Sequence, residues 1–157
     1  MDKKLIKAIL DVIKDVSDRP GLYGCAFERQ YVYFTDGYVV VRLEMNQYEG
    51  LRTFVNEGGY WVGGEQLKED YKRLGARDIQ LTFKNDGGEN HPDWEKAWKQ
   101  WSDTEPTADP VPIRPETFKK LAPFGDMLMT ITENKMGQKL VAFTGKGVNA
   151  FACPLIK

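Results

Sequence analysis

The stretch LYGCAFERQYVYFTDGYVVVRLEM, residues 22–45, constrains the fold of the chain more than any other. It divides into three apolar and aromatic runs of strand-like composition, at residues 22–27, 31–34 and 38–45. The pair Asp36-Gly37 separates the last two runs and is typical of a tight hairpin turn, because glycine takes positive φ without steric cost. The stretch therefore predicts a three-stranded antiparallel meander, with the run Val39-Val40-Val41 buried on both faces. For Asp36 the pattern indicates turn chemistry rather than catalysis, since no second acid or base stands at a matching position.

An amphipathic helix is predicted ahead of the meander, over residues 2–18. Its apolar face is formed by residues at helical spacing: Leu5, Ile6, Ile9, Leu10, Ile13 and Val16. The sequence Arg19-Pro20-Gly21 ends the helix, since the residue before a proline avoids the helical region. On one flank lie Lys3, Lys7 and Lys14. These lysines indicate either a solvated face or a row directed at phosphates.

A second helix is expected at residues 65–74, after a short strand at 60–62 and the pair Gly63-Gly64. Its lysines Lys68 and Lys72 share one face. Such a junction can hold an anion at the helix N-terminus. However, the Gly-Lys-Ser/Thr ending of a phosphate loop is absent, and Glu65 stands where the phosphate would bind, so we expect no nucleotide site. A further strand is predicted at 78–83.

Three tryptophans mark the next segment. Trp94, Trp98 and Trp101 follow Pro92 at i, i+4 and i+7, which places them on one face of a short helix. They predict either an aromatic lid packed on the domain or a surface that docks a protein partner. The nearby residues His91, Asp93 and Glu95 match no known metal-ligand spacing, so no metal site is expected. Residues 103–112, rich in proline and acids, indicate a linker.

The last third of the chain contains a strand-like run at 111–113, a helix at 115–122 and strands at 127–132, 140–144 and 148–155. In this helix Phe118, Leu121 and Ala122 are expected to face inward, and Lys119 and Lys120 outward. The segment VGGEQLK, residues 62–68, also aligns with IRPETFK, residues 113–119.

These elements together predict an α+β fold built from repeated units of one helix and an antiparallel meander, with the helices on one face of the sheets. We interpret residues 1–157 as a single domain. It consists of a first part, a tryptophan-rich connecting segment with its linker, and a second part, at residues 1–83, 84–110 and 111–157.

Composition narrows the class of function. The chain has 157 residues, 41% hydrophobic and 29% charged, with a formal net charge of −1, which excludes a basic nucleic-acid coat. A single histidine and the lack of paired acids at useful spacing argue against an enzyme, and no cofactor is indicated. No signal peptide or membrane span is apparent, so we expect a cytoplasmic protein without membrane contact. Cys25 and Cys153 are expected to be buried, reduced thiols, with a disulfide as the alternative if their strands are neighbours.

Four segments, in matching order, resemble the bacterial polymerase beta clamp, a DNA sliding clamp. The segment FTDGYVV, residues 34–40, is similar to the clamp's Thr-Asp-Gly turn and the strand after it. Residues 62–74 resemble its second helix, and HPDW, residues 91–94, resembles its aromatic-Pro-Asp-aromatic segment. The ending ACPL, residues 152–155, resembles its C-terminal apolar-Pro-apolar triplet.

The resemblance implies a non-enzymatic protein of DNA replication, a processivity factor that forms oligomers. Duplex DNA would be contacted without reading its sequence, by helix lysines: Lys3, Lys7, Lys14, Lys68, Lys72, Lys119 and Lys120. A polymerase or other replication protein would dock at the positions that match the clamp's peptide pocket: Gly37, Tyr38, Val39, Val40, Pro154 and Leu155.

Some features depart from the family. A bacterial clamp chain has three such domains, whereas this chain is about one domain long, which would suit a bacteriophage or a mobile element. The usual Arg-Leu after the turn is Val39-Val40 here. The alternative function is that of a small phage-type interaction protein, which binds and modulates a host protein through Trp94, Trp98 and Trp101.

Overall fold

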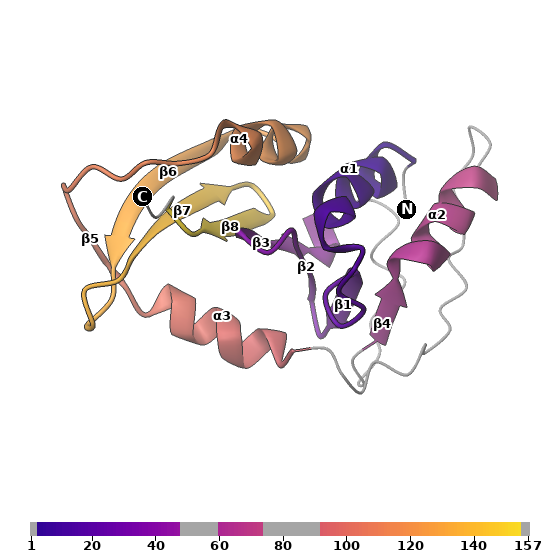
Figure 1. Cartoon of the computed structure of the whole chain (residues 1–157), viewed down its shortest axis with the longest axis horizontal. Helices are drawn as coiled ribbons and strands as arrows, with labels where there is room; N and C mark the ends of the chain where they lie inside the picture. Colours follow the sequence, from indigo (N-terminus) through magenta and orange to yellow (C-terminus); the bar gives the residue numbers. More distant parts are fainter. Residues whose placement is uncertain (1–2, 48–59, 74–91, 155–157) are drawn as a thin grey trace.

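The structure, a computed structural model, describes residues 3–47, 60–73 and 92–154. Within these ranges the chain forms an eight-stranded antiparallel sheet with helices packed on both faces. Figure 1 shows α1 and α4 on one side of the strands and α3 on the other. The architecture is therefore α+β, as the sequence predicts.

The helices and strands have the following bounds. The α-helices are α1 (Lys3–Ile13), α2 (Gly64–Arg73), α3 (Trp94–Ser102) and α4 (Pro115–Leu121). The first group of strands is β1 (Gly24–Glu28), β2 (Tyr31–Thr35), β3 (Val39–Glu44) and β4 (Tyr60–Gly63). The second group is β5 (Glu105–Pro106), β6 (Met127–Glu133), β7 (Lys139–Gly145) and β8 (Val148–Ala152). Short 3₁₀ turns, η1 (Lys14–Val16), η2 (Met45–Gln47) and η5 (Ala122–Phe124), extend α1, β3 and α4.

The sheet is organised around the pairing of β3 with β8. The strand order is β4-β1-β2-β3-β8-β7-β6-β5. On each side of the central β3–β8 ladder the sheet therefore consists of a three-stranded meander and then one more strand at the edge. The ladder runs from Val39 opposite Ala152 to Leu43 opposite Val148. A strand near residue 40 and one near residue 150 thus become neighbours at the middle of the molecule.

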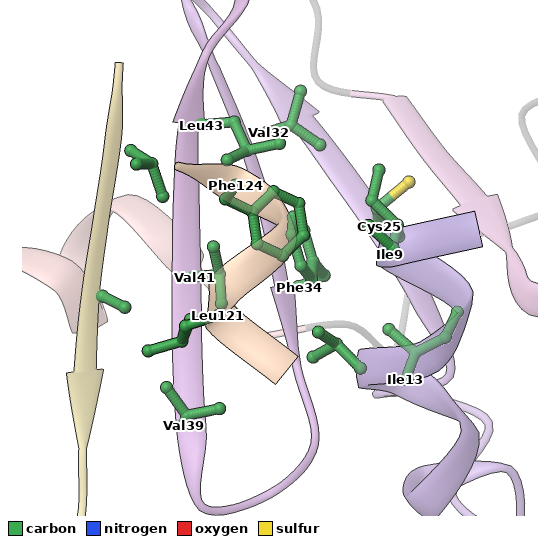
Figure 2. Packing of buried hydrophobic residues seen from close by; sticks show 14 of the residues in the cluster. Ile9, Ile13, Cys25, Val32, Phe34, Val39, Val41, Leu43, Leu121 and Phe124 are labelled. Carbon is green, nitrogen blue, oxygen red and sulfur yellow. The ribbon is translucent and has the colours of Figure 1, made fainter. Parts of the chain in front are cut away.

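One face of the sheet carries the larger core. Alternate residues of β1 to β3, such as Cys25, Phe34 and Val41, point to this face and pack against α1, α2 and α4. The apolar stripe of α1 is buried there, and Leu67 of α2 and Leu121 of α4 complete the cover. Figure 2 shows side chains from α1, from α4 and from the turn after it converging on β2 and β3: Ile9, Ile13, Leu121, Phe124, Phe34 and Val41.

The opposite face carries a smaller, aromatic core under α3. Trp94 and Trp98 pack on Tyr33 and Val40, whose side chains alternate with those of the larger core. The Tyr33 and Trp94 rings stack with centroids 6.2 Å apart. The expectation that helices lie on one face therefore holds for α1, α2 and α4, whereas α3 covers the other face.

Most elements agree with the sequence-based expectations, with differences in the connecting regions. The expected linker at 103–112 contains β5, which pairs with the end of β6. The strand-like run at 111–113 forms no strand; Val111 and Ile113 instead pack, half-buried, against the larger core. The strand predicted at 78–83 lies outside the described residues.

Candidate partner-docking cleft

The Thr-Asp-Gly turn between β2 and β3 is held by its own side chains. Thr35 Oγ1 donates to the Val39 carbonyl at 2.7 Å and accepts from the Gly37 amide at 3.0 Å. Asp36 Oδ1 accepts from the amides of Tyr38 and Val39, both at 2.8 Å. Gly37 has φ of 93°, a conformation that favours glycine. The turn chemistry expected for Asp36 is thus present, and the turn has a defined shape.

The β3–β8 pairing brings the C-terminal segment to this turn. The Cys153 amide donates to the Tyr38 carbonyl at 2.8 Å, directly beyond the last pair of the ladder. Gly37 and Tyr38 therefore lie beside Cys153 and Pro154 within one chain. Leu155, also expected at this site, lies outside the described residues. Val39 and Val40 are buried, at 1% and 6% exposure, and contribute to the walls from within the sheet.

A cleft with two compartments opens where these segments meet. The smaller compartment lies against the turn and is lined by Gly37, Tyr38, Val39 and Val40, among others. The larger has a volume of about 870 Å³ and lies between the end of α3, the segment before α4 and the β6–β7 hairpin. Trp101, Leu140 and Cys153 line both compartments and connect them.

The walls of the cleft are apolar with a small number of neutral polar groups. Val111, Pro112 and Met136 contribute apolar surface to the larger compartment, and Met136 is 82% exposed. The amides of Gln100, Asn134 and Gln138 lie around it. Lys139 also lines it, but its ammonium is paired with Asp109 at 2.9 Å. An apolar, extended peptide that needs few charged contacts fits this chemistry.

Tyr38 stands at the mouth of the smaller compartment. Its ring is 52% exposed and stacks under the Arg114 guanidinium, 4.1 Å from the ring centroid. Arg114 is the N-cap residue of α4, so the start of this helix fixes the ring from outside. An exposed, braced aromatic ring beside a small apolar hollow is a suitable anchor for a partner side chain.

The three tryptophans of α3 do not form one docking face. Trp94 and Trp98 are 2% and 5% exposed, because they fill the core between α3 and the sheet. They are therefore corrected from partner-binding to core positions. Only the half-buried Trp101 reaches the cleft. Of the two interpretations of this helix, the packed lid is the one that the structure has, and a tryptophan-rich partner face is not formed.

Six of the seven lysines expected at DNA are exposed on the helices of the larger-core face. Several already have partners in the chain. Lys7 pairs with Asp11 at 2.8 Å, Lys68 with Glu65 at 3.4 Å, and Lys119 with Glu116 at 3.8 Å. The ammonium of Lys3 lies 4.8 Å from the centre of the Tyr71 ring. Among the described residues Lys14 and Lys72 have no ion pair, so the positive potential of this face is smaller than the number of lysines indicates.

Lys120 is the exception and is corrected to an internal position. Its side chain is 8% exposed, and its Nζ donates to Asp15 Oδ2 and to Asp36 Oδ2, each at 2.6 Å. The inward face of α4 is formed by Thr117, Lys120 and Leu121, whereas Phe118 is 44% exposed and Ala122 is exposed. The helix is thus rotated by about one residue from the apolar stripe read in the sequence.

Lys120, Asp15 and Asp36 form a charged cluster, called here the Lys120 cluster, in which the charges affect one another. Burial by itself lowers the pKa of Lys120, but the hydrogen bonds to Asp15 and Asp36 outweigh it and hold the pKa above its ordinary value. The hydrogen bond from Lys120 holds the pKa of the Asp15 carboxyl below its usual range. Lys120 therefore stays protonated and cannot reach a phosphate at the surface.

The two thiols are free and differ in environment. Cys25 is fully buried in the larger core, and burial raises the pKa of its thiol. Cys153 is exposed in the cleft, which corrects the expectation that both are buried. Burial of its sulfur and then the negative charge of Asp36 raise the pKa of Cys153. The two cysteines form no disulfide with each other.

Some site residues were not apparent from the sequence. The hairpin from Asn134 to Leu140 forms a wall of the cleft, and none of the site residues expected from the sequence lies in it. The Lys120–Asp36 contact joins residues 84 positions apart, and no local signal points to it. Among residues 3–47, 60–73 and 92–154 no group of His, Cys, Asp or Glu could hold a metal ion, and no helix is long and apolar enough to cross a membrane.

Comparisons with known proteins give a fold but no sequence relative. No family model matches the sequence, and no curated protein matches it. Among solved structures, the Helicobacter pylori beta clamp bound to a DNA ligase peptide matches with a TM-score of 0.58 and 12% identity. DNA polymerase III subunit beta from Borrelia burgdorferi, in complex with a natural product, matches with a TM-score of 0.54 and 10% identity.

Each match covers 99% of this chain and 63% of the other, so the chain spans less than two thirds of the length of these clamps. The resemblance inferred from the sequence is confirmed at the level of the fold: this chain has a fold similar to that of bacterial beta clamps.

Proposed function

We propose that this protein is a clamp-like, non-enzymatic factor in DNA replication that docks a polymerase or another replication protein through a peptide segment in the cleft. The observation that carries the proposal is the meeting of the Thr-Asp-Gly turn with Cys153 and Pro154 at an open, mostly apolar cleft. The clamp-like fold supports the same role.

The cleft suits an extended peptide with apolar anchors. A small hollow beside Tyr38 can take one side chain, and the larger compartment, about 870 Å³, can take the rest of a short segment. The side-chain amides of Gln100 and Gln138 can pair with the peptide backbone, which has no net charge. Trp101 lies between the two compartments, where an aromatic side chain contributes most to binding.

We further propose that duplex DNA is contacted by the face that carries α1, α2 and α4. Lys14 and Lys72 are exposed on this face without ion pairs to described residues, and Lys3, Lys7, Lys68 and Lys119 add charges that are shared with neighbours. Such contacts act on phosphates and do not read sequence. Because several lysines are partly neutralised, the contact is weak and depends on low salt.

We also propose that the protein acts as a homo-oligomer that associates through the partly unpaired strand β6. In the described part of the chain β6 pairs with β7 over its whole length but with β5 only at Glu133 and Thr132. At the other end of β6, Leu128 is 77% exposed and Met129 is 52% exposed. No residue from Met127 to Thr132 is charged, so no charge opposes pairing of this edge with a strand of another copy. This edge supports association between copies.

Peptide docking is tested by titrating a fluorescent DNA ligase peptide, of the kind bound to the Helicobacter pylori clamp, into the protein. Micromolar binding is expected, and Tyr38→Ala and Trp101→Ala should each weaken it by about tenfold, as for loss of an aromatic anchor. Phe118→Ala is the matched control, because this exposed ring on α4 packs on Phe143 and does not line the cleft. Binding that is absent, or equal in all three variants, would refute the docking site.

DNA contact and oligomer formation are tested by size-exclusion chromatography with light scattering, at low salt, with and without duplex DNA. Binding should disappear when Lys7, Lys14 and Lys72 are replaced together by Glu. A control variant with Lys96, Lys99 and Lys135 replaced by Glu has the same net charge, and the two helical lysines among them belong to α3. Equal loss in both variants would mean that net charge, and not the helix face, governs binding. A monomer with no DNA affinity would refute both proposals.

A further inference from the structure

The cluster around Lys120 lies directly behind the turn that forms one wall of the cleft. Asp36 is 5% exposed, and each of its carboxylate oxygens has a distinct task. Oδ1 accepts the two amides that shape the turn, and Oδ2 accepts the ammonium of Lys120. Any shift of Lys120 therefore acts on the same carboxylate that holds Tyr38 and Val39.

An ion pair at this depth contributes geometry more than stability. Removing two charges from water is costly, and apolar side chains of similar volume commonly pack with equal or better stability. A buried ammonium instead fixes the positions of the groups that it binds. Here Lys120 Nζ lies 2.6 Å from a carboxylate oxygen of each of two aspartates. The second carboxylate, Asp15, belongs to the turn after α1, is 52% exposed and holds the ammonium from outside.

A second contact from the same helix fixes the outer side of the turn. The Arg114 guanidinium, at the start of α4, lies 4.1 Å from the centre of the Tyr38 ring. Arg19 also approaches Gly37, since a Cβ placed there would lie 3.5 Å from Arg19 Nη1. The groups around Asp36 are thus Lys120, Asp15, Arg114 and Arg19 on the helix side and the Cys153 thiol on the cleft side.

We propose that Lys120 is a positioning residue for the cleft: through Asp36, and with Arg114 over Tyr38, α4 sets the position of the Thr35–Tyr38 turn and so the shape of the smaller compartment. The importance of that shape for a partner rests on the proposed function. The mechanical link itself does not, because it joins residues of this chain alone.

Cys153 offers a direct measurement of this link. The chain has two cysteines, and Cys25 is fully buried, so alkylation of the folded protein by iodoacetamide reports on Cys153. Cys153 lines the cleft with Gly37 and Tyr38, and its amide is bonded to Tyr38. The rate of alkylation as a function of pH gives the apparent pKa of this thiol, which responds to the charge on Asp36.

The apparent pKa of Cys153 should shift in opposite directions when Lys120 loses its charge and when Asp36 loses its charge. In Lys120→Met the Asp36 charge loses its counter-ion, and the apparent pKa of Cys153 should rise. In Asp36→Asn the negative charge is removed while Lys120 remains, and the apparent pKa of Cys153 should fall. Loosening of the fold alone would move both variants in the same direction, toward the value of an exposed thiol.

Matched controls separate position from stability. Lys119→Met alters the neighbouring lysine, which is exposed and paired with Glu116, and should leave the profile of Cys153 unchanged. Lys120→Arg keeps the charge and should restore most of the wild-type profile. If Lys120→Met does not fold, Lys120→Arg and Asp36→Asn still decide the matter. Equal profiles in Asp36→Asn and wild type, or shifts of the same sign in both charge-removing variants, would overturn the proposal.

Peptide titration then separates this proposal from the proposed function. Lys120→Met should weaken binding of the DNA ligase peptide about tenfold, with Lys120→Arg close to wild type. Shifted Cys153 profiles in a protein that binds no peptide would support the positioning role and refute docking. Peptide binding that Lys120→Met leaves unchanged, with an unchanged Cys153 profile, would support docking and refute the positioning role.

Discussion

The two helix-and-meander units of the molecule share an order of elements but differ in burial. The first unit, α1 with β1 to β3, has helices on both faces, and β2 and β3 are buried almost throughout. In the second unit, α4 with β6 to β8, three of the five residues from Met127 to Ile131 are exposed and the other two are half-buried, so neither face of this part of β6 is fully covered. α1 buries six residues over three turns, whereas the shorter α4 buries three, one of them a lysine.

This difference indicates a division of tasks within one sheet. The first unit carries most of the core and so most of the stability. The second contributes the β6–β7 hairpin and the segment before α4 to the cleft, together with the open edge of β6. The turn at Asp36 belongs to the first unit but is fixed by α4 of the second, which places the candidate site at the junction of the two.

The largest effect is expected from a cavity in the first unit. Phe34 is fully buried and its ring lies 5.6 Å from that of Phe124, so Phe34→Ala should lower the free energy of unfolding by about 4 kcal/mol. Leu128→Ala in the second unit, at a side chain that is 77% exposed, should change it by less than about 0.5 kcal/mol. Urea denaturation of both variants measures the contrast, and equal losses would contradict the assignment of the core to the first unit.

The connection between the units should have the next largest effect. Lys120→Met leaves the buried Asp36 carboxylate without its counter-charge and should cost about 3 kcal/mol. The double variant Lys120→Met with Asp36→Asn should recover a large part of this loss, because both charges are then removed while an amide oxygen can still accept from Tyr38 and Val39. A double-mutant cycle by denaturation gives the coupling, and a value near zero would mean that the pair is not formed.

One hairpin turn in each unit contains a glycine with positive φ. Gly37 and Gly137 have φ of 93° and 78°, so Gly37→Ala and Gly137→Ala should each cost about 1 kcal/mol. Gly37→Ala should also weaken peptide binding through the smaller compartment and Gly137→Ala through the larger one, since each glycine lines its own compartment. Thermal melts and peptide titrations on the same samples separate stability from the shape of the turn.

The smallest expected effect is a dependence of stability on pH through Asp15. Its pKa is lowered in the folded protein by the hydrogen bond from Lys120, so its contribution is present above the unfolded pKa of about 4 and is lost as pH falls through the folded value. The stability difference between wild type and Asp15→Asn should therefore be constant near neutral pH and vanish in acid. A difference that grows in acid would reverse the assigned sign.

Local patterns were sufficient to predict the elements of the sheet. The three apolar and aromatic runs in residues 22–45 and the Asp36-Gly37 pair predict a meander, and the structure has β1, β2 and β3 there. The apolar spacing of α1 likewise determined which side of the helix is buried. In these segments burial follows directly from periodicity.

Features that depend on distant partners could not be predicted in this way. In α4, the stripe containing Phe118 and the stripe containing Lys120 are one residue apart, and only the position of Asp36 and Asp15 decides which one faces inward. For Trp94 and Trp98 the helical spacing allowed both a lid and a docking face, and the packing on Tyr33 decided it. The cleft depends on the pairing of β3 with β8, which no local pattern specifies.

The position of β8 has a consequence for synthesis of the chain. β8 is the latest of the described strands to be translated, yet it lies between β3 and β7 at the middle of the sheet. The ribosome therefore releases β3 with an unpaired, valine-rich edge that waits for about a hundred further residues before its neighbour exists. During that interval the edge of β3 that β8 later pairs is open, which exposes the nascent chain to aggregation.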